Sequence, residues 1–373
     1  MKVAVVRAIE TARVSLDADP ELTVHGAKGA HARSDFLLVR VVVDDRGREV
    51  VGYGEVSATP LWSGEDGVTA DHLIRTVLTP ALLGAPVAPV GALERAMDRV
   101  LAANPFTKAG VATALWDAWA RVLDVPLTVA LGGPYRTEIP IKLSLSGDGE
   151  VLDTAYAAAE RAGFGAFKVK VGLGLAGDVA RVARARALVG PDTFLGVDAN
   201  GGWSRAEAAR AVAGLAPYDV AFVEQPVPAD DLEGLAAVRA AGATVIADEA
   251  VFGMADLVRL VRADAADVVS VYVGKAGGPG RAVELGRTAA AFGVRSLLGS
   301  NGELGIGAAA QLHVACALPD LTTEFPSDII GAHYYSEDIL AVPLDSDGRR
   351  VRLGDAPGLG VVPRDDVVAL FAP

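Results

Sequence analysis

The sequence predicts an α/β protein built on a (β/α)8 barrel, with a smaller α+β domain before it. From about residue 139, short apolar runs alternate with Ala- and Arg-rich helical stretches. Repeated βα units imply a parallel sheet, and eight of them close as a barrel, with an open doubly wound sheet as the structural alternative. The eight predicted strands are IPIKLSL, FGAFKVKV, TFLGVDAN, VAFVEQP, TVIADEA, DVVSVYV, VRSLLGS and DLTTEF.

The segments on either side of these runs show a different pattern of strands and helices. Strand-like runs cover Lys2–Leu16, Phe36–Val43 and Val50–Val56, and helical patterns cover about 69–83, 91–102 and 107–123. After about residue 337 the alternation stops and turns with short strands follow. We therefore expect an N-terminal α+β domain over 1–125 and a barrel over 126–337. A C-terminal segment over 338–373 should pack back on the first domain.

Composition excludes several classes of protein. The 373 residues are 51% hydrophobic and 22% charged, which is enough for a large core and argues against disorder. The net charge of −13 makes nucleic acid or an anionic membrane an unfavourable partner. Charges interrupt the N-terminal apolar run, no segment is long enough for a membrane helix, and Cys316 is the single cysteine. These features favour a cytoplasmic protein.

Three predicted barrel strands end in a carboxylate. Asp198 closes FLGVD, Glu224 closes AFVE and Asp248 closes TVIAD, one βα unit apart each time. The carboxyl ends of barrel strands meet at one rim, where the active sites of this fold lie. Taken singly, each Asp could instead cap a helix. Three in register would repel unless a cation neutralised them, and hard oxygen ligands suit Mg²⁺, with Mn²⁺ as a substitute.

Two lysines occupy one face of the second predicted barrel strand. Side chains alternate along a strand, so Lys168 and Lys170 point the same way. Neither face of a barrel strand meets water, so both lysines are expected at the open end, near negative charge. Repulsion and desolvation would lower the pKa of one of them toward neutrality, as a lysine base requires. A solvated pair at a frayed strand end is the alternative.

Five short motifs follow one another in the chain: Lys-x-Lys, Asp-x-Asn, Glu-Gln-Pro, Asp-Glu and Gly-Gly. With this order the chain resembles the enolase superfamily, and within it the muconate-lactonizing-enzyme (muconate cycloisomerase) subgroup of the mandelate racemase/muconate lactonizing enzyme family. The resemblance covers the whole length and implies a modified, TIM-like barrel whose N-terminal capping domain is completed by the C-terminal tail. Gly52–Glu55 and Trp62–Glu65 resemble the capping-domain strand and specificity loop, and the segment from His25 to Arg33 resembles a mobile loop over the substrate.

The resemblance also implies roles for individual residues. The implied metal ligands are Asp198, Glu224 and Asp248, the implied acid/base is Lys170 with Lys168 as its electrostatic partner, and the implied substrate-binding positions are Asn200, Glu303 and Glu324. The family also implies a small-molecule carboxylate substrate and a homo-oligomer, either a dimer or an octamer.

One position departs from the family pattern. The second catalytic lysine of the family ends the sixth strand, where this chain has Tyr272, and Lys275 matches a neighbouring basic position. A shift of three residues would restore Lys275 to the site, but the Gly-Gly motif argues against that shift. Neutral tyrosine, with a pKa of about 10, is a poor base. The departure therefore favours a reaction that needs one base.

Several functions fit these residues. The leading hypothesis is a muconate-cycloisomerase-like cycloisomerase or lyase that moves a proton next to a carboxylate through a metal-stabilised enolate. The alternative is an N-acyl amino acid or dipeptide racemase, which a lysine at the end of the sixth strand would favour. A sugar-acid dehydratase would need a histidine near Gly299–Asn301. A metal-binding barrel that has lost catalysis is the non-enzymatic alternative.

Overall fold

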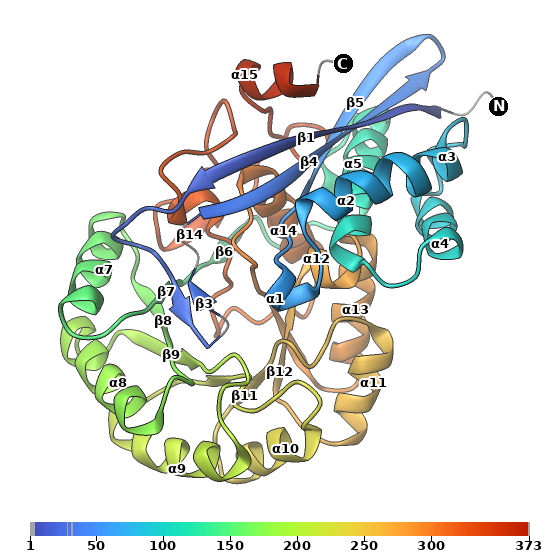
Figure 1. Ribbon diagram of the computed structural model, residues 1–373. Helices are drawn as coiled ribbons and strands as arrows, with labels where there is room; N and C mark the ends of the chain where they lie inside the picture. Colours follow the sequence, from blue (N-terminus) through green and yellow to red (C-terminus); the bar gives the residue numbers. More distant parts are fainter. Residues whose placement is uncertain (1–3, 28, 31–32, 372–373) are drawn as a thin grey trace.

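The computed structural model describes residues 4–27, 29–30 and 33–371, and it consists of a barrel with a sheet and helices packed beside it (Figure 1). The N-terminal sheet has three antiparallel strands in the order β1-β4-β5: Val5–Asp17, Arg33–Asp45 and Arg48–Val56. The start of the predicted strand at Lys2 lies outside the described residues. A short hairpin, β2 (His25–Gly26) and β3 (Gly29–Ala30), falls between β1 and β4.

The helices after this sheet match the predicted ranges closely. They are α1 (Pro60–Ser63), α2 (Gly67–Leu73) with a π-helical continuation to Leu78, α3 (Thr79–Leu82), α4 (Val90–Val100) and α5 (Pro105–Leu123). Helix α5 lies directly on β5. A Cβ added at Gly54 would lie 2.0 Å from the Gly110 oxygen, and one added at Gly52 would lie 2.2 Å from the Ala114 oxygen. Glycine is therefore required on β5 because the two backbones approach so closely.

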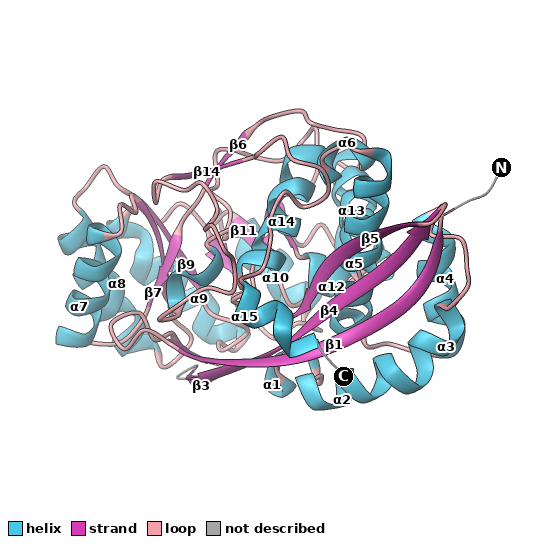
Figure 2. Cartoon of the chain, turned by 90° about the horizontal axis from the view of Figure 1, so that it is seen from above, coloured by secondary structure: helices cyan, strands magenta, loops and turns pink. Residues whose placement is uncertain are grey.

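The barrel contains a seven-stranded parallel sheet, whose strands neighbour one another in chain order. They are β7 (Leu143–Leu145), β8 (Ala166–Lys170), β9 (Phe194–Asp198), β10 (Val223–Glu224), β11 (Val245–Ala247), β12 (Val268–Val271) and β13 (Arg295–Leu298). The surrounding helices are α7 (Glu150–Arg161), α8 (Leu175–Val189), α9 (Arg205–Leu215), α10 (Leu232–Ala240), α11 (Met254–Arg262), α13 (Pro279–Ala291) and α14 (Gly305–Ala317). Figure 2 shows these helices around the strands, with the N-terminal sheet alongside.

Two of the eight predicted strands differ from the structure. The first divides at Pro140: β6 (Glu138–Pro140) pairs antiparallel with β14 (Arg350–Arg352), and only β7 enters the barrel. The eighth, DLTTEF, forms no regular strand. This segment and the residues after it close the ring through isolated parallel bridges. Leu321 pairs with Ser296 on β13, and Ser327 pairs with Ile141 before β7. The predicted barrel is therefore confirmed, with an irregular eighth side.

The floor of the barrel is aromatic. Phe194, Phe222 and Phe325 meet with ring centroids 5.9–6.3 Å apart. Gly196 leaves room for them, since a Cβ there would lie 2.2 Å from the Phe222 ring. A barrel interior filled by side chains at this end is a core and not a channel. Polar side chains can therefore gather only at the opposite end, where the strands finish.

The C-terminal segment contacts both parts of the protein. Strand β14 pairs beside the barrel, while Phe371 packs on Tyr53 of the N-terminal sheet with ring centroids 6.2 Å apart. The tail also holds His313 of α14: its Nδ1 accepts from the Thr128 N–H at 3.0 Å, so its Nε2 donates to the Leu359 carbonyl at 3.1 Å. His313 therefore has a structural position. No helix within the described ranges is long and apolar enough to cross a membrane.

Candidate active site

Three carboxylates lie together at the open end of the barrel. Asp198 ends β9, Glu224 ends β10 opposite Asp198 in the parallel register, and Asp248 directly follows β11. All three are at most 1% exposed. Burial, only partly offset by the ammonium group of Lys168, raises the pKa of Glu224 to about 8. Buried like charges of this kind need cations around them.

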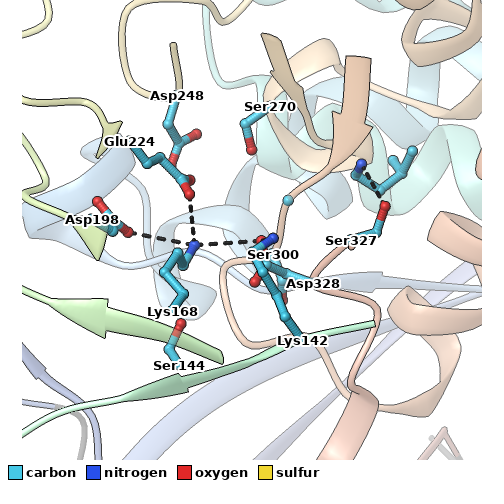
Figure 3. Close-up of polar contacts among 12 residues, drawn as sticks. Lys142, Ser144, Lys168, Asp198, Glu224, Asp248, Ser270, Ser300, Ser327 and Asp328 are labelled. Carbon is cyan, nitrogen blue, oxygen red and sulfur yellow. Dashed lines mark hydrogen bonds and ion pairs between the residues drawn. The ribbon is translucent and has the colours of Figure 1, made fainter. Parts of the chain in front are cut away.

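Lys168 supplies one of these cations from the middle of the cluster (Figure 3). Its Nζ lies 2.9 Å from Glu224, 3.4 Å from Asp328 and 3.5 Å from Asp198. Burial acts against the charge of Lys168, but the surrounding carboxylates, Asp328 first, raise its pKa well above the ordinary value. The expected lowering of one of the two lysine pKa values is therefore not found at Lys168, because the surrounding carboxylates stabilise its charge.

Lys170 lies on the same face of β8, closer to the solvent side. Its Nζ donates to Asp198 at 2.7 Å and to the side-chain oxygen of Asn200 at 2.8 Å. The amide nitrogen of Asn200 in turn donates to Glu249 at 3.0 Å. Lys170 and Asn200 both line the pocket that opens above the barrel. The predicted acid/base and its neighbouring amide are therefore within reach of a bound molecule.

Two residues follow the sixth barrel strand, β12: Tyr272 lines this pocket, whereas Lys275 does not. Tyr272 lines the pocket, and its hydroxyl donates to Asp248 at 2.8 Å. Burial and the nearby carboxylates raise the pKa of Tyr272 well above its ordinary value, so the phenol is neutral. Lys275 lies behind it, fully engaged with the Asp248 carboxylate at 2.6 Å and with two backbone carbonyls at 2.8 Å.

Two charged residues in the site were not predicted. Asp328, on the irregular eighth side, lines the pocket and is shared by Lys168 and by Lys142, whose Nζ lies 2.9 Å away. Lys142 is 0% exposed, and burial lowers its pKa. The sequence held a signal for Lys142, a lysine inside the apolar run IPIKLSL, but none of this kind for Asp328, which follows the mixed segment TTEFPS.

The two predicted acidic positions after β13 do not join the cluster. Glu303 is buried behind the pocket wall, where it accepts from Ser300 and from Gln311. Glu324 is 70% exposed and pairs with Arg295, the first residue of β13, at 2.6 Å. Side chains alternate along an extended segment, so Phe325 enters the barrel floor and Glu324 points outward. Asp328, four residues further on, takes the place at the rim that Glu324 was expected to have.

The donor set of the cluster fits a hard divalent cation. Asp198, Glu224 and Asp248 offer only carboxylate oxygens, the ligands that Mg²⁺ prefers. Glu224 Oε1 is buried and has no hydrogen-bond partner among the described residues. Lys168 holds the other oxygen of Glu224, Lys170 holds an oxygen of Asp198, and Lys275 and Tyr272 hold the two oxygens of Asp248. In the described part of the chain the carboxylates do not close around a common point. Binding of a cation would therefore require these ammonium groups to release their carboxylates.

The hairpin β2–β3 covers the reacting end of the pocket. A Cβ added at Gly26 would lie 3.4 Å from the Asn200 oxygen and 3.7 Å from the Lys170 side chain. The hairpin is held to the barrel because the His25 N–H donates to Ser146, which follows β7, at 2.9 Å. Residues 28 and 31–32 of the predicted loop lie outside the described residues. The described part of the hairpin restricts the access of water to Lys170.

A barrel with an acidic, lysine-containing rim and a covering N-terminal sheet defines a class of proton-transferring enzymes. The family model "Enolase C-terminal domain-like" matches residues 150–367, and "Mandelate racemase / muconate lactonizing enzyme, N-terminal domain" matches residues 9–132. The chain therefore belongs to the enolase superfamily, in its muconate-lactonizing-enzyme subgroup. It is an isomerase-type enzyme of that superfamily.

Similar proteins include enzymes with two kinds of reaction. Muconate cycloisomerase 1 of Rhodococcus opacus is 35% identical over 326 residues, which cover 86% of this chain and 87% of the relative. L-Ala-D/L-Glu epimerase of Bacillus subtilis is 32% identical over 335 residues, or 88% and 89% of the two chains. The structure of muconate lactonizing enzyme from Pseudomonas fluorescens with muconolactone superposes with a TM-score of 0.91 at 26% identity, covering 99% and 100% of the chains.

Proposed function

We propose that this enzyme moves a proton next to the carboxylate of a small molecule with Lys170 as its single acid/base. The reaction class that follows is a cycloisomerase or lyase of the muconate-cycloisomerase type. One observation carries the proposal: Lys170 faces the pocket from the second strand, whereas the sixth strand presents the neutral phenol of Tyr272. Proton transfer therefore takes place on the Lys170 side of the substrate only.

The proposed metal site supports this chemistry. Asp198, Glu224 and Asp248 would hold Mg²⁺, which stabilises the negative charge that develops when a proton leaves the carbon beside a carboxylate. Lys168 adds positive charge next to the same carboxylate. The Lys170 ammonium would first release Asp198 and give one proton to water; the neutral amine then takes the proton from the substrate, and Asn200 orients it through the 2.8 Å contact. The hairpin over Lys170 limits the exchange of that proton with bulk water.

Tyr272 cannot replace the missing second base. Its pKa lies well above the ordinary value because the ring is buried next to carboxylates, and its hydroxyl proton is donated to Asp248. Lys275 is held by the same carboxylate from behind and does not line the pocket. A racemase needs an acid/base on each face of the enolate. Racemisation, the activity named for several relatives, is therefore the weaker candidate, and loss of catalysis is disfavoured because Lys170 and the acidic rim are complete.

The stereochemical course of exchange tests the proposal. N-acyl amino acids and dipeptides of one configuration are incubated with enzyme and Mg²⁺ in deuterated water, and both deuterium content and configuration are followed by NMR and chiral chromatography. We expect exchange or reaction with the configuration kept. Lys170→Ala should abolish exchange, with general acid–base catalysis supplying roughly 10²–10⁴ of the rate. Tyr272→Lys is the matched gain-of-function variant and should introduce slow racemisation.

Two results would contradict this function. Racemisation by the wild type at a rate close to that of exchange would require a second base at Tyr272 or Lys275. Exchange by Lys170→Ala at the wild-type rate would exclude Lys170 as the base. The family resemblance also implies a homo-oligomer, either a dimer or an octamer. This separate proposal is tested by light scattering.

A further inference from the structure

We infer that the substrate of this enzyme carries its single charge at the reacting end and ends in an uncharged, apolar group. The inference rests on the proposed function and concerns the same pocket. It narrows the substrate class from carboxylates in general to monocarboxylates with an apolar tail. A dicarboxylate of the muconate type, with a charge at each end, would be a poor ligand. Within the proposed function the inference therefore favours a lyase over a lactone-forming cycloisomerase, which needs a second carboxylate.

The positive charge of the pocket is confined to one end. Among the described residues that line the pocket, the cations are Lys168 and Lys170, both on β8 beside the acidic rim. The anion on the opposite side of Lys168 is Asp328, which is already shared with Lys142. A carboxylate bound near β8 would meet two ammonium groups. A carboxylate at any other part of the described wall would meet none.

Four apolar side chains also line the pocket. Leu22 and Val24 line it from the segment after β1, Trp62 from α1, and Ile330 from the segment after Asp328. The Trp62 ring is stacked on Tyr272, with centroids 5.4 Å apart and an interplanar angle of 18°. These side chains come from both the N-terminal domain and the barrel. They give the pocket apolar surface that suits an alkyl or aromatic group.

Three polar side chains that line the pocket are already hydrogen-bonded to the protein. The Asn301 amide donates to the Ser57 carbonyl at 2.8 Å. The Tyr334 hydroxyl accepts from the Ser144 N–H at 2.8 Å, and the Tyr335 hydroxyl donates to a backbone carbonyl at 3.0 Å. A second carboxylate placed here would lose its water without gaining a cation, which is strongly unfavourable. An apolar tail would lose no hydrogen bonds to water on binding, because it makes none.

A matched pair of ligands tests the inference directly. Hexanoate and adipate have the same chain length, and a methyl group in one replaces a carboxylate in the other. Their dissociation constants are measured by calorimetry with the full chain and saturating Mg²⁺. We expect hexanoate to bind at least about tenfold more tightly than adipate, because a desolvated carboxylate without a partner is costly. Val24→Arg should reverse the preference by placing a cation on the wall.

Val342→Arg is the control variant. Val342 is 75% exposed and lies away from the pocket-lining residues, so the same added charge there should leave the preference unchanged. Adipate binding as tightly as hexanoate to the wild type would overturn the inference, as would the absence of measurable hexanoate binding.

The two proposals fail in different ways. The ligand preference is measured without turnover and does not depend on which residue moves the proton. Retained deuterium exchange in Lys170→Ala would contradict the proposed function and leave the ligand preference intact. Tight adipate binding with exchange lost in Lys170→Ala would overturn only the inference about the apolar tail.

Discussion

Removing the hydroxyl of Tyr272 separates its structural contribution from any part in proton transfer. In the folded protein this hydroxyl donates to the Asp248 carboxylate at 2.8 Å. A hydrogen bond to a charged group contributes about 1.5–3 kcal/mol to the free energy of unfolding. The loss in Tyr272→Phe should stay within this range, because Asp248 keeps its contact with Lys275 at 2.6 Å and the ring keeps its stacking on Trp62.

The predicted change can be measured as a melting temperature. For a chain of 373 residues, an unfolding entropy of about 2.1 cal/mol/K per residue converts this loss into a decrease of about 2–4 °C. The assay is differential scanning calorimetry of wild type and Tyr272→Phe at matched Mg²⁺ concentrations, with α-proton exchange followed in parallel. Tyr53→Phe is the matched control, since no hydrogen bond of the Tyr53 hydroxyl is found among the described residues, and it should leave the melting temperature nearly unchanged.

Two outcomes would refute this reasoning. An unchanged melting temperature would mean that the hydroxyl does not bond to Asp248 in solution. A loss of exchange by several orders of magnitude, with stability retained, would mean that Tyr272 moves a proton. The expected combination is a modest loss of stability with exchange reduced by less than about tenfold, corresponding to less than about 1.4 kcal/mol in the barrier.

The other predictions concern the metal site, the N-terminal domain and pH. Asp198→Asn should abolish the thermal stabilisation by Mg²⁺, and calorimetry showing equal Mg²⁺ binding would contradict the ligand assignment. Gly54→Ala places a Cβ 2.0 Å from the Gly110 oxygen and should cost about 3 kcal/mol in urea unfolding, whereas Gly177→Ala, with open space around it, should not. Burial lowers the pKa of His313 to about 4, below its unfolded value of about 6.5, so stability present above pH 6.5 is lost as the pH falls toward 4. The loss between pH 7.5 and 5 should be about 2 kcal/mol, and it should disappear in His313→Asn; an unchanged pH dependence in that variant would disprove the assignment.

Local patterns in the sequence predicted most of the fold and part of the site. Strand ends and the two-residue alternation of side chains placed Asp198 and Glu224 at the rim and Lys168 and Lys170 on one face. These rules act within one strand or between neighbouring strands, so a sequence is enough to apply them. The position of Tyr272 was also predicted, because the resemblance to the family aligns it with the lysine that ends the sixth strand.

The contacts across the barrel were decided by the tertiary structure alone. Asp328 and not Glu324 reaches the rim, because the eighth side closes through irregular bridges that direct Phe325 into the floor. Lys142 meets Lys168 over the same carboxylate only once β7 and the eighth side close the ring. Desolvation and the sharing of one carboxylate by two lysines depend on residues far apart in sequence. The pKa of Lys168 is raised for that reason, since its charge is set by the neighbours that folding assembles around it.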